Sequence, residues 1–391
     1  MFSLTLEFKL KPTVAKIAVF EDWLEQCLKV YNSALKERKD WYNSRKCQIN
    51  SCSKSSEYII IPADGPLPTY SSQCKALTTY RKSSPALLRV NAALLQQTPL
   101  RLEKSFVTMW EPNHGFPRFK KQGTQRSFNE PQFGVTFHQD NRFKLPVNGC
   151  IKFWQYRPIP QGAIVKQARL VRRSTGWYIM LTFQWDVSIP DTIPHGNPVG
   201  MDVGLTNFIA TSNGLLIKRT SFLAEAERKL KLLQKRVTRK KIVSNNRKIA
   251  AKKVALLHEY VANSRKDGHP KLSHQICDNA GMVFVEDLNL VGSKAAMLGK
   301  HCLDAGFGQF FNILDQVCFK RGVYFPKVDG NKTREICPNC LKETGKKELS
   351  ERVHSCHYCA YRTDRDVAAA QVVLKRALAA VGQTVKMLAC K

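Results

Sequence analysis

Four of the thirteen cysteines form two Cys-x-x-Cys pairs in the last sixth of the chain. Cys337 pairs with Cys340 and Cys356 with Cys359, and 15 residues separate the pairs. Four thiolates complete the tetrahedral shell of one zinc ion, and this spacing lies at the lower edge of the two-pair zinc pattern. Because no coordination position stays open, we expect a single structural zinc. His354 and His357 flank the second pair and could replace a cysteine as ligands.

Three acidic residues have local settings that suit a catalytic metal site. Asp202 lies in a predicted strand of residues 199–205, Glu286 ends the apolar run Met-Val-Phe-Val, and Asp366 opens an alanine-rich predicted helix. Nucleases of the RNase H class hold two divalent metals between such carboxylates, one metal activating water and the other stabilising the leaving 3′ oxygen. The three acids therefore predict a two-magnesium nuclease site, with each of them as a metal ligand and a catalytic residue.

Two neighbouring acids are alternatives to this set. Asp287 follows Glu286 directly, but strand side chains alternate, so it should point to the opposite face of the sheet. Asp364 precedes the helix and could be its cap instead of a ligand.

The predicted secondary structure that must position these residues changes along the chain from strand to helix and back to strand. An alternating strand from residue 2 is ended by Pro12, helical patterns follow to about residue 110, and strands return over 115–190, including a hairpin at Ser174-Thr175-Gly176. Helices thus interrupt a β domain. Pro190, Pro194 and Pro198 mark a boundary, after which a meander of short strands opens a second domain.

The charge balance points to a polyanionic partner. The chain has 62 Lys and Arg against 31 acidic residues, a net charge of +31, and such an excess opposes compact folding unless an anion offsets it. Residues 218–271 hold 17 of the basic residues and four acidic ones, with apolar residues at helical spacing, so a basic helical hairpin is expected. No run approaches the length of a membrane span, and the scattered cysteines suit a reducing cytoplasm.

Several stretches together resemble the TnpB family of transposon-encoded RNA-guided nucleases, relatives and ancestors of type V CRISPR effectors. The stretches are Gly115-Phe-Pro-Arg-Phe-Lys-Lys121, Gly200-Met-Asp-Val-Gly-Leu-Thr-Asn207, Val285-Glu-Asp-Leu-Asn289, the two cysteine pairs, and Thr363-Asp-Arg-Asp-Val-Ala-Ala-Ala370. They follow the family's order over nearly the whole chain.

The resemblance implies a multidomain α/β protein. Residues 1–12 and 113–195 would form a β-barrel-like wedge domain, interrupted by a helical recognition lobe at 13–112. Residues 196–330 would form an RNase H-like RuvC domain with the basic hairpin at 218–275 and a lid at 291–303. A zinc ribbon that binds target nucleic acid would occupy 331–363, and residues 364–391 would complete the RuvC domain and the tail.

The resemblance also implies an activity. A transposon-derived ωRNA would guide the protein to double-stranded DNA beside a short adjacent motif, and a single RuvC site would cut it with two Mg²⁺ ions. The family's ligands map onto Asp202, Glu286 and Asp366. The protein would be a monomer within its ribonucleoprotein, in the cytoplasm of a prokaryote and associated with the nucleoid. One departure stands at Ala368, where the family usually has Asn.

Candidate nucleic-acid contacts combine charge with aromatic or amide groups. For the adjacent motif they are Tyr70, Gln73 and Lys75, and for the backbone they are Arg118, Lys120, Lys121 and Arg365. Three alternatives stay open: a guided repressor that does not cut, a compact type V CRISPR effector, and a DDE transposase. The last orders its acids Asp, Asp, Glu, whereas this chain has Asp, Glu, Asp.

Overall fold

The computed structural model describes most of the chain, in twelve stretches. They are residues 2–46, 61–111, 114–131, 137–138, 142–145, 149–159, 164–185, 192–219, 222–287, 305–346, 348 and 351–389. The chain divides into two units, Met1–Ile189 and Pro190–Lys391, so the division falls at the first of the three boundary prolines. The predicted lid at 291–303 lies outside the described residues. Within the described part, no helix combines the length and apolar character that crossing a membrane requires.

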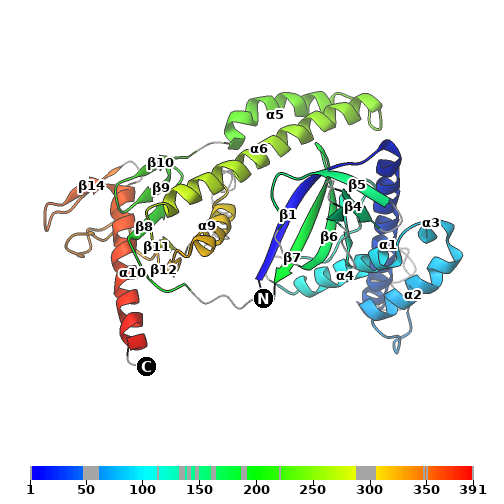
Figure 1. The fold of residues 1–391 in the computed structure, drawn as a ribbon, viewed down its shortest axis with the longest axis horizontal. Helices are drawn as coiled ribbons and strands as arrows, with labels where there is room; N and C mark the ends of the chain where they lie inside the picture. Colours follow the sequence, from blue (N-terminus) through cyan, green and yellow to red (C-terminus); the bar gives the residue numbers. More distant parts are fainter. Residues whose placement is uncertain are drawn as a thin grey trace. The chain divides into compact units, whose positions relative to one another are not determined.

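The first unit contains one sheet, and its strands come from segments before and after a helical block in the sequence (Figure 1). Its strands are β1 (Phe2–Lys11), β2 (Ser127–Glu130), β3 (Phe137–His138), β4 (Arg142–Leu145), β5 (Gly149–Trp154), β6 (Ile164–Arg173) and β7 (Gly176–Trp185). They lie in the order β2-β6-β7-β1-β5-β4-β3. Because β1 sits between β7 and β5, the strands before and after the helices belong to the same sheet.

The helices between β1 and β2 pack on this sheet through a shared core. They are α1 (Val14–Lys46), α2 (Tyr70–Ser83), α3 (Pro85–Leu88) and α4 (Ala92–Thr108). Phe20 and Trp23 of α1 are buried against Phe128 of β2 and Trp177 of β7. The apolar residues of α1 from Phe20 to Val30 thus share a core with the sheet, whereas Tyr31 and Leu35 pack against Leu102 of α4.

The second unit holds a five-stranded sheet in the order β10-β9-β8-β11-β12. Its strands are β8 (Pro198–Val203), β9 (Asn207–Thr211), β10 (Leu216–Lys218), β11 (Met282–Glu286) and β12 (Lys327–Val328). β8, β9 and β10 form the predicted antiparallel meander, whereas β11 runs parallel to both β8 and β12. Since β8 and β11 are parallel neighbours, their carboxyl ends meet at one edge of the sheet.

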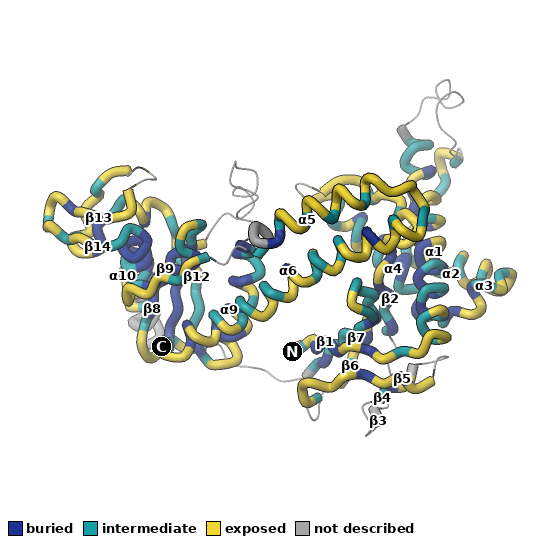
Figure 2. The backbone as a smooth tube through the Cα atoms, turned by 90° about the horizontal axis from the view of Figure 1, so that it is seen from above, coloured by how far each residue is buried: buried dark blue, intermediate teal, exposed yellow. Residues whose placement is uncertain are grey.

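Helices cover both faces of this sheet. α9 (Phe307–Arg321) and the end of α6 (Asn245–Cys277) lie on one face and α10 (Arg365–Ala389) lies on the other, while α5 (Phe222–Thr238) packs on α6. β13 (Val353–Ser355) pairs with β14 (Arg362–Asp364) in a small separate ribbon. Phe310 and Leu314 of α9 pack on Val283 on one face, and Val373 of α10 packs on Phe284 on the other. Figure 2 shows the resulting buried layer in β8, β9 and α10, and the mostly exposed residues of the hairpin α5–α6.

Gly200 allows the close approach of α10 to β8. A Cβ at this position would lie 2.8 Å from the Cβ of Leu374 and would overlap the carbonyl oxygen of Ala370. We expect Gly200→Ala to lower the free energy of unfolding of the second unit by about 2 to 3 kcal/mol, because the backbone of α10 must move. Urea unfolding measures this loss. Gly382→Ala on the same helix is the control, since its Cβ meets nothing within 4 Å, and it should be neutral or slightly stabilising.

His269 is a buried histidine in the core of the second unit. It is 2% exposed and its ring stacks on Phe208 at 5.6 Å. Burial, and secondarily the positive charge of Arg265, lower the pKa of His269 from 6.5 to about 4. Between pH 6.5 and 4, His269 is therefore protonated in the unfolded chain and neutral in the folded chain. The free energy of unfolding falls as the pH falls through that window.

The pH dependence of unfolding tests the burial of His269. With allowance for screening, protonation should cost about 1 kcal/mol at pH 5 relative to pH 7.5. His269→Phe should remove that part of the acid destabilisation, measured as the change in melting temperature between the two pH values. His258→Phe is the matched control, because His258 lies exposed on the same helix. An unchanged pH profile in the His269 variant would contradict the prediction.

Candidate functional site: three carboxylates and a cysteine cluster

Asp202 and Glu286 point to the same face of the second sheet. In β8 the even-numbered residues face α10, as the close approach at Gly200 shows. In β11 Met282 and Phe284 pack on α10, so by strand alternation Glu286 lies on that face too. Val285 pairs with Met201 in register, which places Glu286 level with Asp202. Two carboxylates far apart in sequence thus meet at one sheet edge.

Asp366 joins them from the start of α10. It is the second residue of the helix and 9% exposed, while Asp202 and Glu286 are 1% and 7% exposed. Its carboxylate Oδ2 accepts a hydrogen bond of 2.9 Å from the side-chain amide of Asn207. The pKa of Asp202 is sensitive to the charges of both Glu286 and Asp366. The structure therefore brings the three predicted carboxylates into one electrostatic neighbourhood.

The two alternative acids have other roles in the structure. The carboxylate of Asp364 accepts hydrogen bonds from the backbone N–H groups of Asp366 and Val367, at 2.8 and 3.3 Å, so the suggestion that it caps the helix is confirmed. Asp287 is exposed and forms an ion pair of 3.3 Å with Lys327. Neither residue takes the place of Asp366 or Glu286 at the sheet edge.

The segment before the first cysteine pair supplies partners to two of the carboxylates. The hydroxyl of Thr333 donates a hydrogen bond to Glu286, and Nη2 of Arg334 lies 3.1 and 3.0 Å from the two carboxylate oxygens of Asp202. Gly330 lies so close to Glu286 that a Cβ there would be 3.1 Å from its Cδ. We call residues 330–334 the strap, because this segment connects the carboxylates to the cysteine cluster.

The electrostatics of the site are determined by three buried carboxylates that act on one another. The pKa of Asp202 is raised to about 7, chiefly by burial; Arg334 opposes the shift, and the charges of Glu286 and Asp366 add to it. Buried like charges of this kind are costly unless a cation offsets them. Carboxylate oxygens are also the ligands that Mg²⁺ prefers, so the chemistry of these three side chains suits a divalent cation, although among the described residues the four cysteines are the group whose ligand atoms are gathered within 4.8 Å of one another.

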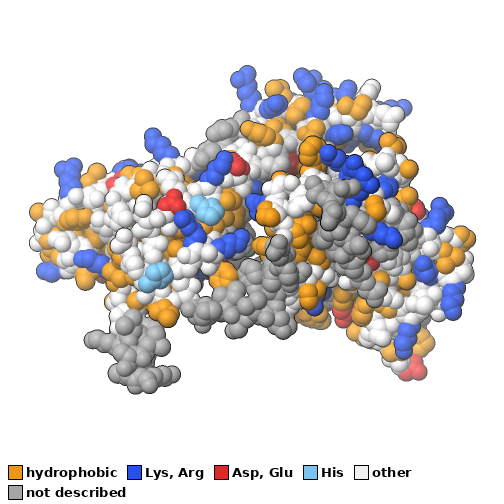
Figure 3. All heavy atoms as spheres, viewed as in Figure 1, with side chains coloured by type: hydrophobic (Ala, Val, Ile, Leu, Met, Phe, Trp, Pro, Cys, Tyr) orange, Lys and Arg blue, Asp and Glu red, His pale blue; other side chains and the backbone are white. Residues whose placement is uncertain are grey.

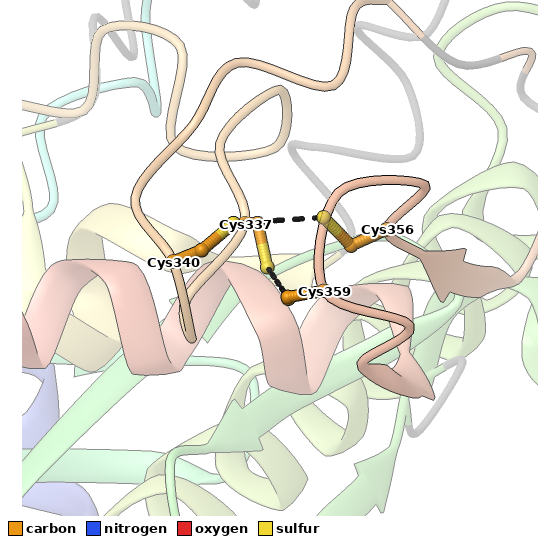
Figure 4. Close-up of side chains that lie close together, drawn as sticks. All are labelled: Cys337, Cys340, Cys356 and Cys359. Atoms are coloured by element: carbon orange, nitrogen blue, oxygen red, sulfur yellow. Dashed lines mark hydrogen bonds between the residues drawn. The ribbon is translucent and has the colours of Figure 1, made fainter.

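The four cysteines come from two turns, Cys337 and Cys340 from one and Cys356 and Cys359 from the turn that joins β13 to β14, with their side chains turned toward one another (Figure 4). Their sulfurs all lie within 4.8 Å of each other. Sγ of Cys337 is 3.7 Å from that of Cys359, and Sγ of Cys340 is 3.6 Å from that of Cys356. Thiolates around tetrahedral zinc at 2.3 Å would lie about 3.8 Å apart. The cluster is therefore compatible with a zinc ion.

The histidines beside the second pair are not part of this cluster. Among the described residues, the four cysteines are the set of close metal-ligand side chains that the structure contains. His354 is buried at 1% exposure and His357 is exposed. Hydrogen bonding from the backbone of Tyr361 lowers the pKa of Cys359 to about 6, and burial raises that of Cys337 to about 11. Zinc binding would therefore release protons and strengthen with rising pH.

The predicted nucleic-acid contacts differ in how free their side chains are. Lys75, Arg118 and Lys121 are exposed and Tyr70 is partly exposed. Gln73 is 4% exposed and bonds to Arg38, Glu37 and the carbonyl of Ala34. A base contact by Gln73 would require these bonds to open.

Lys120 and Arg365 already have protein partners. Lys120 is partly buried, with its ammonium 3.9 Å from the ring centre of Tyr31 and bonded to Gln125. Arg365 donates to the carbonyl oxygens of Glu348 and Glu351. The nucleic-acid role of all seven residues stays a prediction.

Three residues that touch the carboxylates were not singled out from the sequence. Asn207 ends the stretch that begins at Gly200, and Thr333 and Arg334 stand just before Cys337. Their contacts cross 159, 47 and 132 residues of chain, so no local pattern reveals them. Ala368, the departure noted in the sequence, is 2% exposed on the buried side of α10.

Three family models match the chain. Residues 183–296 match the OrfB_IS605 model, described as a probable transposase, and residues 307–373 match the TNB domain of Cas12f1-like proteins. Residues 1–47 match a helix-turn-helix model of OrfB_IS605 proteins, although residues 2–46 form the strand β1 and the single long helix α1, apart from a short link between them.

Two curated relatives match over most of the length of this chain, and a third matches over a shorter part. One is "Putative RNA-guided DNA endonuclease InsQ" of Escherichia coli K12, 28% identical over 314 residues that make up 75% of this chain and 76% of the relative. Another is a "Putative RNA-guided DNA endonuclease" of Streptomyces pristinaespiralis, 27% identical over 90% of this chain and 83% of the relative. The mimivirus "TnpB-like protein L79" is 29% identical over 127 residues, 30% of this chain and 24% of its own. These matches confirm the resemblance to the TnpB family.

Solved structures give a weaker likeness to this chain. The Cas12f1-sgRNA-target DNA complex matches with 16% identity and a TM-score of 0.35, over 96% of this chain and 99% of that chain. CasPhi-2 (Cas12j) bound to crRNA matches with 10% identity and a TM-score of 0.37, over 97% and 98%. TM-scores this low do not establish a common arrangement of the whole chain.

Proposed function

We propose that this TnpB-family protein is an RNA-guided DNA endonuclease with one RuvC-type active site formed by Asp202, Glu286 and Asp366. The single observation that carries the proposal is the placement of these three carboxylates on one face, at neighbouring strand ends and a helix start. The parallel pair β8–β11 beside an antiparallel meander supports an RNase H-like domain, because it brings the acids of distant segments to one edge.

The chemistry assigned to this site is hydrolysis of a phosphodiester bond. Two magnesium ions held by these carboxylates would supply the activation of water and the stabilisation of the leaving 3′ oxygen. The protein's own part is to hold the three carboxylates rigidly: β8 and β11 fix Asp202 and Glu286, and the capped first turn of α10 fixes Asp366. Asn207 and Thr333 orient two of them through hydrogen bonds.

The distribution of positive charge supports nucleic acid as substrate and guide. The hairpin α5–α6 carries Lys and Arg along its exposed surface, and Figure 3 shows blue side chains projecting where Figure 1 places these helices. Lys and Arg on such a surface bind phosphates without reading sequence, and base pairing with a guide would supply specificity. The names of the relatives from Escherichia coli and Streptomyces support RNA as that guide.

Within this proposal the first unit is the wedge domain, with its helices as the recognition lobe that reads the adjacent motif. The guide would be a transposon-derived ωRNA, and the cysteine cluster would hold one structural zinc in a ribbon that contacts target DNA. These assignments rest on family membership and on the order of the elements along the chain.

Purification with its bound RNA tests the proposed function. Sequencing of that RNA should give a single species that maps to a transposon end, and the complex should cut matched DNA only when Mg²⁺ is present. Absence of a specific RNA would refute guided action. Specific RNA and guided binding without cutting would instead indicate a repressor, and an RNA from a repeat array would indicate a CRISPR effector.

A further inference from the structure

The three carboxylates have partners of different charge. Glu286 accepts from the neutral hydroxyl of Thr333 and Asp366 from the neutral amide of Asn207. Asp202, the most buried of the three, is paired with the cation Arg334. The charges of Glu286 and Asp366 also favour the protonated guanidinium of Arg334. Within the described part of the chain, Arg334 thus places one positive charge in the field of all three acids, where a divalent cation would be expected to bind.

The contact uses the atoms that a metal would need. Nη2 of Arg334 lies 3.1 Å from Oδ1 and 3.0 Å from Oδ2 of Asp202, with a further 3.5 Å contact to the carbonyl of Val203. The guanidinium takes up one lone pair of each carboxylate oxygen, and its positive charge repels a divalent cation that binds the others. Arg334 and a cation therefore compete for Asp202.

The position of Arg334 allows it to leave. Its side chain is 43% exposed, against 1% for Asp202, so the guanidinium can return to water at small cost while the carboxylate cannot. Arg334 lies in a turn and outside the helices and strands. The chain on either side of Arg334 is held in place: Thr333 bonds Glu286, and Cys337 belongs to the cysteine cluster.

We infer that Arg334 is a built-in counter-cation of the carboxylate site, which competes with a divalent cation for Asp202 and so lowers the affinity of the site for metal. Arg334 acts here through Asp202 as a positioning residue. The inference rests on the proposed metal site, and its observable is metal binding, which is separate from DNA cleavage.

Binding of Mn²⁺ to the full chain with its RNA tests this inference, with free Mn²⁺ counted by electron paramagnetic resonance. Arg334→Gln should tighten binding on the order of fivefold to tenfold, because the competing charge is gone. Arg334→Met, which keeps the apolar stem, should do the same and serves if the first variant does not fold. Arg321→Gln is the matched control, since Arg321 pairs with Asp278 in the same unit, and should bind as the wild type does.

The outcomes separate the inference from the function on which it rests. Equal or weaker Mn²⁺ binding in the folded Arg334 variants would overturn the competition. Asp202→Asn should abolish the binding that the Arg334 variants strengthen. If Asp202→Asn left Mn²⁺ binding unchanged in an otherwise wild-type chain, the metal site itself would be refuted, whatever the Arg334 variants did.

Discussion

Asp202→Asn is expected to reduce guided DNA cleavage by at least about a thousandfold, because the site loses a negatively charged metal ligand. Guided DNA binding should stay unchanged, since it depends on base pairing and on basic surfaces elsewhere in the chain. The substitution should be well tolerated by the fold. Burial already raises the pKa of Asp202, so a neutral side chain of the same shape relieves a desolvation cost, and the exposed guanidinium of Arg334 can turn to water.

The control for this variant is Asp287→Asn at the same edge of the sheet. Asp287 directly follows Glu286, is exposed, and pairs with Lys327, so its replacement should leave cleavage within about twofold of the wild type. Cleavage rates under single-turnover conditions and binding measured by gel shift would be compared for both variants and for Asp202→Ala. Cleavage retained in the Asp202 variants would contradict the assignment of the metal site.

Much of the site follows from the sequence because each main residue stands in a recognisable local setting. The cysteine spacing requires no knowledge of the fold, and Glu286 ends an apolar strand run. The choice of Asp366 over Asp364 rests chiefly on the motif match in the sequence, and the structure adds that Asp364 bonds the free N–H groups of the first turn of the helix. Local chemistry of this kind is encoded within a few residues.

The residues that contact the three acids cannot be recognised from a local sequence pattern. Arg334 reaches Asp202 because the chain returns to the sheet edge after β12 and before the cysteine cluster, and only the tertiary fold fixes where that return passes. Gln73 shows the same limit. Its neighbours in sequence suggest an exposed amide near a loop, whereas the packing of α2 on α1 buries it against Arg38 and Glu37.

Loss of zinc is expected to have the second large effect, because it should unfold the zinc ribbon and also reduce DNA cleavage at the carboxylate site. Cys340→Ser should reduce bound zinc from about one per chain to nearly none, because structural zinc sites bind cooperatively through all four thiolates. The other supports of the ribbon among the described contacts are separate hydrogen bonds, which do not replace a four-ligand crosslink. They join Tyr361 to Gln371, Lys375 to the carbonyl of Asn339, Arg352 to Thr206, and Arg365 to the carbonyls of Glu348 and Glu351. Its residues should therefore become susceptible to protease, and metal analysis together with limited proteolysis would measure both changes.

Cleavage should fall in the same variant, because the strap runs directly into the first cysteine pair. Thr333 is four residues before Cys337 and orients Glu286, so unfolding of the ribbon releases one end of the segment that holds the site. Cys150→Ser is the matched control, since Cys150 is an exposed free thiol in the first unit, and should keep both zinc and activity. His357→Ala should also keep zinc. Full cleavage by a zinc-free Cys340 variant would show that the strap positions Glu286 without help from the ribbon.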